Sequence, residues 1–580
     1  MQTLAHAALL LGIATLPAWT LPAGAFLAHP DSELPVRLWC FARFQSLGPV
    51  GGPVAELGFP TPGPLNNPDP FATAWMGALA GPLGEARAFD ALVMGTVWLN
   101  MLSAWALARR VWGDAWAATL AGLGVGLAPV VLSYCVMGAI TDMLHLWPWL
   151  LALVALHAAW VAPADAPTRA LVLRGASAGA LAALGFALSP YNLVLALGGG
   201  VPGALLALGW ALRDPARRPA LVRSAPRALG GALLAGGLLA GPWALALRGI
   251  MDDPASTMSS AYVDATRHAP PWREVRPNHP AGYAARLEEY VATAPGDLLA
   301  RDVGSHYART TAVPWVLIAL GCAGALLLRG TGAGRWLAVA GFAAVASTGP
   351  YLSVSETIYL TQPVNPAYRV VYHLLGGRMI LEVFRYGVVA AVAAALAAAA
   401  TVAALRARGG AWRATGPVAC ALLLAQLCGA SPVPWPLPHA TPTVSSAYAQ
   451  LDAALGPGAI LELPYFDRGT GRFARVHFLN QRVHGRPIAD EVRGFPPRLL
   501  LQNPFTVNLL AAEGATGLIR IDKRPEGRED AGRRALAEAG FAGVVVDPAG
   551  YATPEALAEV ERILGPRYTT VGDRRVWRLR

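Results

Sequence analysis

Two carboxylates, Asp31 and Glu33, follow directly after the first long apolar run of the chain, residues 3–28. A carboxylate at the edge of a membrane is costly unless it is hydrated or has a function there. In that position it can accept a proton from a sugar hydroxyl or bind a divalent cation. The simpler alternative is a solvated helix end, and the spacing of the two residues does not by itself choose between these interpretations.

A second group of candidate residues lies far along the chain from the first. Asp142 and His145 stand three apart at the predicted outer start of an apolar helix, which would place them on one helical face. Histidine can bind phosphate or shuttle a proton, and Arg385, at the start of a later apolar helix, offers a fork of donors suited to phosphate. The structural alternatives are an aspartate at a helix N-terminus, a histidine that fills interfacial space and an arginine whose head group reaches water.

Three further polar residues, His477, His484 and Asp490, lie within fourteen residues near the C-terminus. A metal site would need a further ligand at short spacing, so the sequence favours surface residues over a metal site. This region also lacks a GxSxG motif, a P-loop and a GxGxxG after a strand.

The composition limits what can position these residues. Of 580 residues, 54% are hydrophobic and only 14% are charged, whereas a soluble domain carries about 25% charged residues. A polytopic membrane protein is therefore predicted. The net charge of +10 does not indicate nucleic-acid binding, because the arginines mostly flank apolar segments. The five cysteines have no metal-binding spacing; a Cys40–Cys135 disulfide outside the membrane is less favoured than small hydrophobic roles.

Apolar runs recur along residues 1–430 and predict a mainly α-helical transmembrane bundle. About eleven spans are expected, at 3–28, 88–110, 115–137, 142–162, 169–188, 190–211, 225–247, 312–328, 334–350, 383–405 and 412–430. An alternative for the first run is a cleaved signal peptide, because Ala23-Gly24-Ala25 resembles a cleavage site. A retained helix is favoured, since no basic residue precedes the run and it is long enough to span.

The arginines predict the orientation of the bundle. Every second connection, such as the one with Arg109-Arg110, is rich in arginine, and the positive-inside rule assigns those connections to the cytoplasm. The N-terminus then lies inside. The segments expected outside are the loops 29–87, 248–311 and 351–382 and the tail, 431–580.

The tail, residues 431–580, has a different composition, and a small α/β domain outside the cytoplasm is predicted there. Its expected elements are helices at 448–455, 531–539 and from Pro554, strands at 458–464 and 541–546, and a terminal hairpin that turns at Gly572-Asp573.

Several short motifs resemble those of bacterial GT-C-type membrane glycosyltransferases, and most closely an uncharacterised YfhO-like branch. They are His29-Pro30-Asp31-Ser32-Glu33, the ledge Phe59-Pro60…Pro64…Asp69-Pro70, the helix break Ala128-Pro129 before His145…Trp147-Pro148, Thr293-Ala294-Pro295-Gly296-Asp297-Leu298, Gly349-Pro350-Tyr351-Leu352, Phe384-Arg385, Ile460-Leu461-Glu462-Leu463-Pro464 and Gln481…His484-Gly485-Arg486-Pro487. Together they cover nearly the whole chain, although each is short.

The resemblance implies a multi-pass enzyme of the bacterial cytoplasmic membrane that moves a sugar from a polyprenyl-phosphate donor to an acceptor outside the cytoplasm. It would make Asp31 the general base and would place Arg385 near the lipid phosphate. Glu33 is predicted as a second catalytic residue beside Asp31. Some members need a divalent cation and others do not. Many relatives have Gly-Asp where this chain has Pro30-Asp31, so an active and a degenerate site both stay open.

Asn67 and Asp69, on the proline-rich ledge, complete the predicted substrate-binding set together with Asp142, His145 and Arg385. The rival hypothesis is a non-catalytic membrane protein, or a transporter- or flippase-like subunit of envelope polysaccharide or lipid assembly. Transporters usually carry polar residues or broken helices near the membrane midplane. Here the strongly polar residues cluster at the predicted outer face, which favours a site at the membrane surface, with the tail as an accessory to it.

The orientation can be tested by itself. A reporter enzyme that is active only outside the cytoplasm, fused after Arg580, is expected to be active, because the arginine pattern places the tail outside. A cytoplasmic signal would mean that one helix has been miscounted and that Asp31 and the tail lie on opposite faces.

Overall fold

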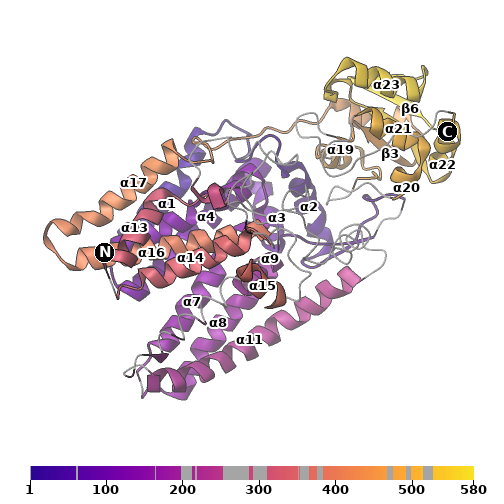
Figure 1. Cartoon of the computed structure of the whole chain (residues 1–580). Coiled ribbons are helices and arrows are strands. Elements are labelled where there is room, and N and C mark those ends of the chain that lie inside the picture. The colour runs from indigo at the N-terminus through magenta and orange to yellow at the C-terminus, as the bar shows by residue number, and fades with distance from the viewer. Residues whose placement is uncertain are drawn as a thin grey trace.

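The structure is a computed structural model in which the described part of residues 2–430 is mostly helical and a mixed sheet with flanking helices follows (Figure 1). It describes residues 2–60, 63–163, 165–197, 205, 209, 212–213, 215, 218–252, 287–291, 310–328, 330–349, 352, 365–374, 383–466, 474–490, 498–513 and 527–579. The predicted outer loops 248–311 and 351–382 lie mostly outside the described residues.

Eight helices of the described part are long and apolar enough to cross a membrane, which confirms a polytopic helical bundle. They are Thr3–Thr20, Glu85–Trp112, Ala115–Val136, Thr141–Trp160, Thr168–Leu188, Arg218–Ile250, Phe384–Ala407 and Gly410–Gly429. Two shorter apolar helices, α13 (Trp315–Leu327) and α14 (Ala333–Ser347), match two more predicted spans. Of the predicted span 190–211, α9 forms Pro190–Leu195, and most of the remainder lies outside the described residues. The count of eleven stays a prediction.

The first predicted span, 3–28, is too long at its C-terminal end. Helix α1 (Gln2–Thr15) passes into a 3₁₀ turn, η1 (Leu16–Thr20), and helical structure stops there. Pro22 follows, and Gly24 has a φ of +78°, a conformation that a helix does not contain. Residues 21–28 therefore approach the next part of the chain, residues 29–84, as an irregular chain. Residues 29–84 are called the outer segment below, because the arginine pattern predicts that they lie outside the cytoplasm.

The centre of the bundle consists of α4 (Glu85–Trp112), α5 (Ala115–Gly126) and α16 (Gly387–Ala407). Alanines of α16 are buried along its length, and a Cβ on Gly124 of α5 would lie 2.9 Å from the Ala395 Cβ. Small residues allow such close approach, which is how helices associate in lipid without a hydrophobic driving force between them.

The remaining helical elements of the bundle are α7 (Trp147–Trp160), α8 (Thr168–Leu188), α11 (Arg218–Asp252), η6 (Leu287–Val291), α15 (Pro366–Leu374), η7 (Val383–Tyr386), η8 (Gly410–Ala414) and α17 (Thr415–Gly429).

The outer segment after the first helix is folded against the bundle. It contains α2 (Leu34–Leu47), a two-stranded hairpin of β1 (Gly51–Pro53) and β2 (Pro64–Asn66), and α3 (Pro70–Leu83). Opposite it, the predicted helix break at Ala128-Pro129 is confirmed, because α5 ends at Gly126. The short elements α6 (Pro129–Leu132), η2 (Ser133–Met137) and η3 (Thr141–Leu144) follow before α7.

The tail contains the small α/β unit that its sequence predicts. Its sheet has the strand order β3-β4-β6-β5, with β3 and β4 parallel and the other pairs antiparallel. The strands are β3 (Ala459–Leu463), β4 (Phe541–Val546), β5 (Thr569–Val571) and β6 (Arg574–Arg578). The helices are η9 (Ser446–Gln450), α18 (Leu451–Ala454), α19 (His477–His484), α20 (Arg498–Gln502), α21 (Pro504–Ala512), α22 (Glu529–Glu538), η10 (Pro548–Gly550) and α23 (Pro554–Leu564).

The tail and the outer segment share one hydrophobic core. Trp39 and Phe44 of α2 belong to the same buried cluster as Tyr448 and Phe478 of the tail. Backbone hydrogen bonds join the two parts as well, since the Phe59 N–H donates to the Ile488 carbonyl at 3.1 Å. The tail is therefore docked on the outer segment through an extensive contact, and α19 lies beside α2 (Figure 1).

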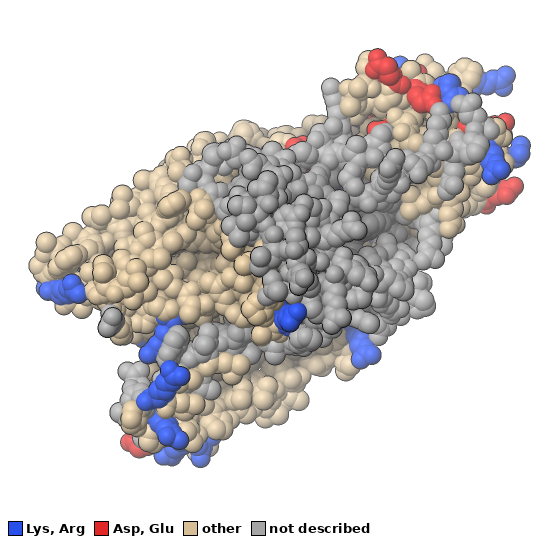
Figure 2. Space-filling model, viewed as in Figure 1, with Lys and Arg blue, Asp and Glu red and all other residues tan. Residues whose placement is uncertain are grey.

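The surface charge is divided between the two ends of the molecule. On the face shown in Figure 2, arginines gather at the helix ends farthest from the tail, isolated basic side chains lie between those ends and the tail, and the tail carries both signs. The two cysteines considered for a disulfide, Cys40 and Cys135, are both buried free thiols. Burial raises the pKa of the Cys40 thiol to about 12 despite the nearby arginines, so it behaves as a packing residue.

Candidate functional site

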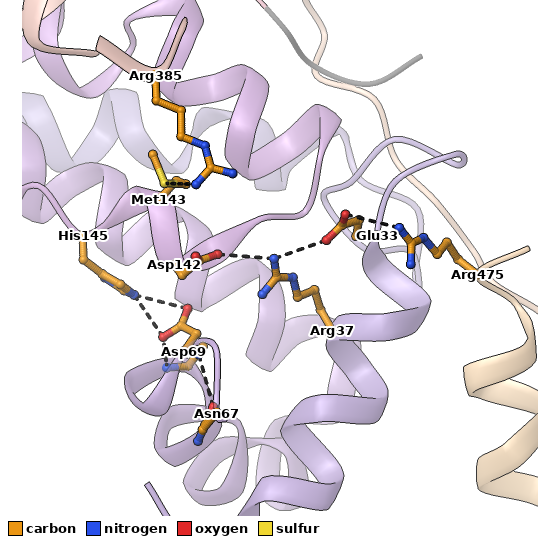
Figure 3. Close-up of polar contacts among 10 residues, drawn as sticks. Glu33, Arg37, Asn67, Asp69, Asp142, Met143, His145, Arg385 and Arg475 are labelled. Atoms are coloured by element: carbon orange, nitrogen blue, oxygen red, sulfur yellow. Dashed lines mark hydrogen bonds and ion pairs between the residues drawn. The ribbon is translucent and has the colours of Figure 1, made fainter. Parts of the chain in front are cut away.

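A buried arginine, Arg37, joins the outer segment to the membrane helices. Its guanidinium lies 3.2 Å from Glu33 Oε2, one helical turn earlier, and 3.3 Å from Asp142 Oδ1, and its side chain is only 9% exposed (Figure 3). Asp142 is equally hidden, with 3% of the residue exposed. One guanidinium thus bridges two carboxylates from segments about a hundred residues apart in the sequence.

The charge of Arg37 is stabilised by these neighbours. Burial acts to lower its pKa, but the negative charges of Asp142 and Glu33 outweigh that effect and raise the pKa above its usual value. Arg37 therefore stays charged at every physiological pH and serves as a permanent ionic link.

On the other side of Asp142 lies Arg385, at the start of the spanning segment Phe384–Ala407. The Arg385 Nη1 is 3.6 Å from the Met143 sulfur, and its guanidinium carbon lies 5.8 Å from the centre of the Tyr134 ring. Arg385 is close enough to Asp142 to act on it electrostatically. Arg37 and Arg385 therefore flank one buried carboxylate (Figure 3).

Asp142 and His145 do not share the helical face that their spacing predicts. The segment Thr141–Leu144 is a 3₁₀ turn, and α7 begins only at Trp147. Asp142 consequently faces Arg37, whereas the His145 Nε2 lies 3.3 and 3.4 Å from the two carboxylate oxygens of Asp69.

The Asp69–His145 pair is completely buried, with no exposed side-chain surface on either residue. Asp69 is also the N-cap of α3, since its carboxylate accepts the Ala72 N–H at 2.9 Å, and Asn67 accepts the Asp69 N–H at 3.1 Å. Burial acts to raise the pKa of Asp69, but His145 and the Ala72 N–H outweigh it and lower the pKa. These three predicted residues lie together beneath α3, and direct contact with a substrate would require this packing to open.

Asp31 lies at the exposed rim of this charged group. Its side chain is 44% exposed and lies 3.8 Å from the His29 ring, while the Asp31 N–H donates to His29 Nδ1 at 3.2 Å. The backbone on either side of it is held: the His29 N–H donates to the Val136 carbonyl and the Glu33 N–H to the Gly138 carbonyl. The loop that carries Asp31 is thus attached to the irregular segment after the helix break.

Two arginines of this group were not predicted as site residues. Arg37 has a local signal, because it follows Glu33 by four positions on a helix. Arg475, which comes from the tail, has none; its guanidinium lies 3.7 Å from Glu33 Oε1 although the two residues are more than four hundred positions apart. Among the described residues, no three His, Cys, Asp or Glu side chains are grouped in a way that would hold a metal ion.

Comparisons with known proteins bear on the fold of the chain. No family model and no curated protein matches the sequence. The solved structure of the arabinofuranosyltransferase AftD from Mycobacteria has a TM-score of 0.54 and 16% identity over 99% of this chain, which spans only 41% of AftD. The chain has a GT-C-like fold.

Two further solved structures overlap more loosely. ArnT from Cupriavidus metallidurans, bound to undecaprenyl phosphate, has a TM-score of 0.45 and 13% identity over 100% of this chain and 97% of its own. The Archaeoglobus fulgidus oligosaccharyltransferase, in a complex with zinc and sulfate, has a TM-score of 0.40 and 12% identity over 93% and 68% of the two chains.

The histidines of the tail are not the surface residues that their sequence suggests. His477 and Asp490 are each 3% exposed, and the His477 Nδ1 lies 3.0 Å from the Asp490 carboxylate. Glu462, on β3, is also buried; it accepts the Asn480 amide at 2.7 Å and lies 3.2 Å from His484 Nε2. Because residues 477, 480 and 484 share one face of α19, the helix turns its histidines toward the domain core.

Replacing Arg37 by leucine is expected to destabilise the protein by about 3–5 kcal/mol, because Asp142 would lose its close partner while remaining buried. The matched control is Arg43→Leu on the same helix, since Arg43 pairs with Glu56 at a partly exposed position and such pairs contribute about 0–1 kcal/mol. Thermal unfolding of the purified full-length chain in detergent measures both. Equal losses in the two variants would contradict a central role for Arg37.

Stability of the tail is expected to fall as the pH rises from about 6.5 to about 9. Burial acts to lower the pKa of His477, but Asp490 and Glu462 outweigh it and raise the pKa from 6.5 to about 9. A histidine whose pKa is higher in the folded than in the unfolded chain stabilises the fold fully at pH values below its unfolded pKa. That stabilisation, on the order of 3 kcal/mol here, is lost as the pH rises and the histidine deprotonates. Glu513, whose pKa burial raises from 4.5 to about 8, adds a decline in the same direction.

The measurement is the temperature at which a protease begins to cleave the tail during heating, determined at several pH values across this range. In His477→Gln the decline above pH 6.5 should be smaller. A tail that becomes more stable, or does not change, between these pH values would contradict the proposed charged state of His477.

Proposed function

We propose that this chain is an integral membrane glycosyltransferase that moves a sugar from a polyprenyl-phosphate donor to an acceptor outside the cytoplasm. The observation that carries the proposal is the continuous charged group at one end of the membrane helices, in which Glu33, Arg37, Asp142 and Arg385 lie side by side below the exposed carboxylate of Asp31. The GT-C-like fold, shared with an arabinofuranosyltransferase, supports a transferase.

Asp31 is the carboxylate best suited to act as a base. A general base needs a lone pair that an incoming hydroxyl can reach. Glu33 is occupied by Arg37 and Arg475, and its side chain is 19% exposed. Asp142 is paired with Arg37 and buried. The Asp31 side chain, at 44% exposed, is the most accessible of the three.

Arg385 is suited to bind the phosphate of the donor. Its guanidinium lies at the start of a membrane-spanning segment, where the head group of a lipid meets the protein. Arg385 stands at one end of the row Arg475–Glu33–Arg37–Asp142–Arg385, next to the buried Asp142. Arginine offers planar donors that match phosphate oxygens.

The reaction then has a simple form. Asp31 takes the proton from an acceptor hydroxyl, and the oxygen attacks the anomeric carbon as the bond to the lipid phosphate breaks with inversion. Arg385 stabilises the negative charge that develops on the departing phosphate. The part of the predicted binding residues Asn67, Asp69 and His145 is indirect. They hold the proline-rich segment at the start of α3, beneath the site.

Localisation in a bacterial cytoplasmic membrane, an outward-facing tail at 431–580 and membership of the YfhO-like branch are parts of the same proposal. They rest on the arginine pattern and the short motifs of the sequence.

The test is transfer by the purified full-length chain in proteoliposomes supplied with radiolabelled polyprenyl-phosphoryl pentoses and hexoses. Asp31→Asn is expected to lower the rate by about 10²- to 10⁴-fold, because an amide keeps the shape but cannot accept the proton. Asp530→Asn, at an exposed position on α22 of the tail, is the matched control and should retain activity.

Full activity in Asp31→Asn would mean that another residue acts as the base.

A second test uses cells that lack the protein, which should accumulate the polyprenyl-linked sugar donor. If they instead show a lipid-linked sugar trapped on the cytoplasmic face, with no transfer by the wild-type chain, the transporter or flippase hypothesis would replace this one.

A further inference from the structure

The tail contributes a charged residue to the site. Arg475 lies just before α19, and its guanidinium is 3.7 Å from Glu33 Oε1, with side chains that are only 16% and 19% exposed. The other oxygen of the same carboxylate, Oε2, is held by Arg37 at 3.2 Å. The Glu33 carboxylate is therefore held by two arginines, Arg37 of α2 and Arg475 of the tail (Figure 3).

The position of Arg475 is fixed because α19 is attached on two faces. Toward the bundle, Gln481 accepts the Trp39 indole N–H at 2.7 Å, and Phe478 packs edge-on against the Trp39 ring at 6.0 Å. Toward the tail, His477 pairs with the buried Asp490. A helix held in this way presents its first residues at a defined place over α2.

The carboxylate that Arg475 holds lies two residues from Asp31. The His29 N–H bonds to the Val136 carbonyl and the Glu33 N–H to the Gly138 carbonyl, so the Asp31 loop is fixed through its backbone at both ends and through the Glu33 side chain. An error of about 1 Å in the placement of a reacting group can lower a rate by about 10²-fold. The Glu33 side chain is therefore placed to influence Asp31, the base in the function proposed above.

We infer that Arg475 is a positioning residue of the transferase site, which holds the Asp31 loop in its active geometry by binding Glu33. This inference rests on the function proposed above. The tail is then a structural part of the active site, and removing its contact with Glu33 changes the chemical step without changing the affinity for the donor.

Kinetics of the full-length chain in proteoliposomes, with the polyprenyl-phosphoryl sugar that the wild type uses, test the inference. Arg475→Gln is expected to lower kcat by roughly five- to fiftyfold and to leave KM for the donor within about twofold. The matched control is Arg482→Gln, because Arg482 joins the tail to Glu85 at 3.0 Å in the same interface but touches no residue of the site. Its kcat should stay within about twofold of the wild type.

A double variant shows whether Arg475 acts through Glu33. If it does, Glu33→Gln combined with Arg475→Gln should be no slower than Glu33→Gln alone, since the second change removes an interaction that is already lost. The inference would be overturned if the losses in kcat of the two single variants multiply in the double variant. It would also be overturned if Arg475→Gln and Arg482→Gln lose equal activity, because the tail would then act only through its general docking.

A spin label on Asp31→Cys gives a readout that does not need activity. The label is placed in a chain whose two exposed cysteines, Cys322 and Cys428, are replaced by alanine. Arg475→Gln should increase the mobility of the label, and Arg482→Gln should not. A label that is equally immobile in all chains would refute the inference, whereas a wild type inactive with every donor but with this mobility difference would count against the proposed function alone.

Discussion

The structure depends on one buried guanidinium. Taking the charge of Arg37 out of water is costly, and the cost is offset only because Glu33 and Asp142 both lie within about 3.3 Å of it. The ion pair is directional, so it forms only when the outer segment and the start of the Thr141–Trp160 segment are correctly placed. It therefore selects one arrangement of the loop over the bundle, which apolar packing alone would specify less sharply.

The helix break at Ala128-Pro129 makes this pairing possible. Between α5 and α7 the chain runs through short α, π and 3₁₀ turns, and this irregular backbone receives N–H groups from His29 and Glu33. Irregular backbone at the end of a membrane bundle is tolerated where it is buried in protein. Here it supplies carbonyl acceptors for the outer loop and turns Asp142 toward Arg37, so the break is what brings the predicted residues of two distant segments together.

Sequence patterns predicted the elements well where the determinants are local. The strand Phe541–Val546 and the terminal hairpin follow from apolar runs and turn residues, and both are present as expected. The break at Ala128-Pro129, predicted from the family resemblance, is also what the chemistry of proline favours. Helix length was harder to predict, since the apolar run to residue 28 continues past the helix end at Thr20 into an irregular segment whose last residues, 25–28, are buried by tertiary contacts.

The partners within the site could not be predicted from local patterns. The pairing of Arg37 with Asp142, and of Glu33 with Arg475, joins residues about one hundred and more than four hundred positions apart. His477 and His484 looked like surface residues, because a short polar helix normally turns such side chains to water. Their side chains are buried because α19 packs against α2 and turns His477 toward Asp490 and His484 toward Glu462 of the tail.

The shared core determines how the role of the tail can be examined. Trp39 and Phe44 pack with Tyr448 and Phe478, so cutting the chain after residue 430 would expose aromatic side chains on the outer segment as well as remove Arg475. Loss of activity on truncation would then report unfolding of the Asp31 loop as readily as loss of a catalytic contribution. Single charge changes at partly buried positions leave the apolar core intact. The contact between Arg475 and Glu33 is therefore the place where the contribution of the tail to the site can be separated from its contribution to folding.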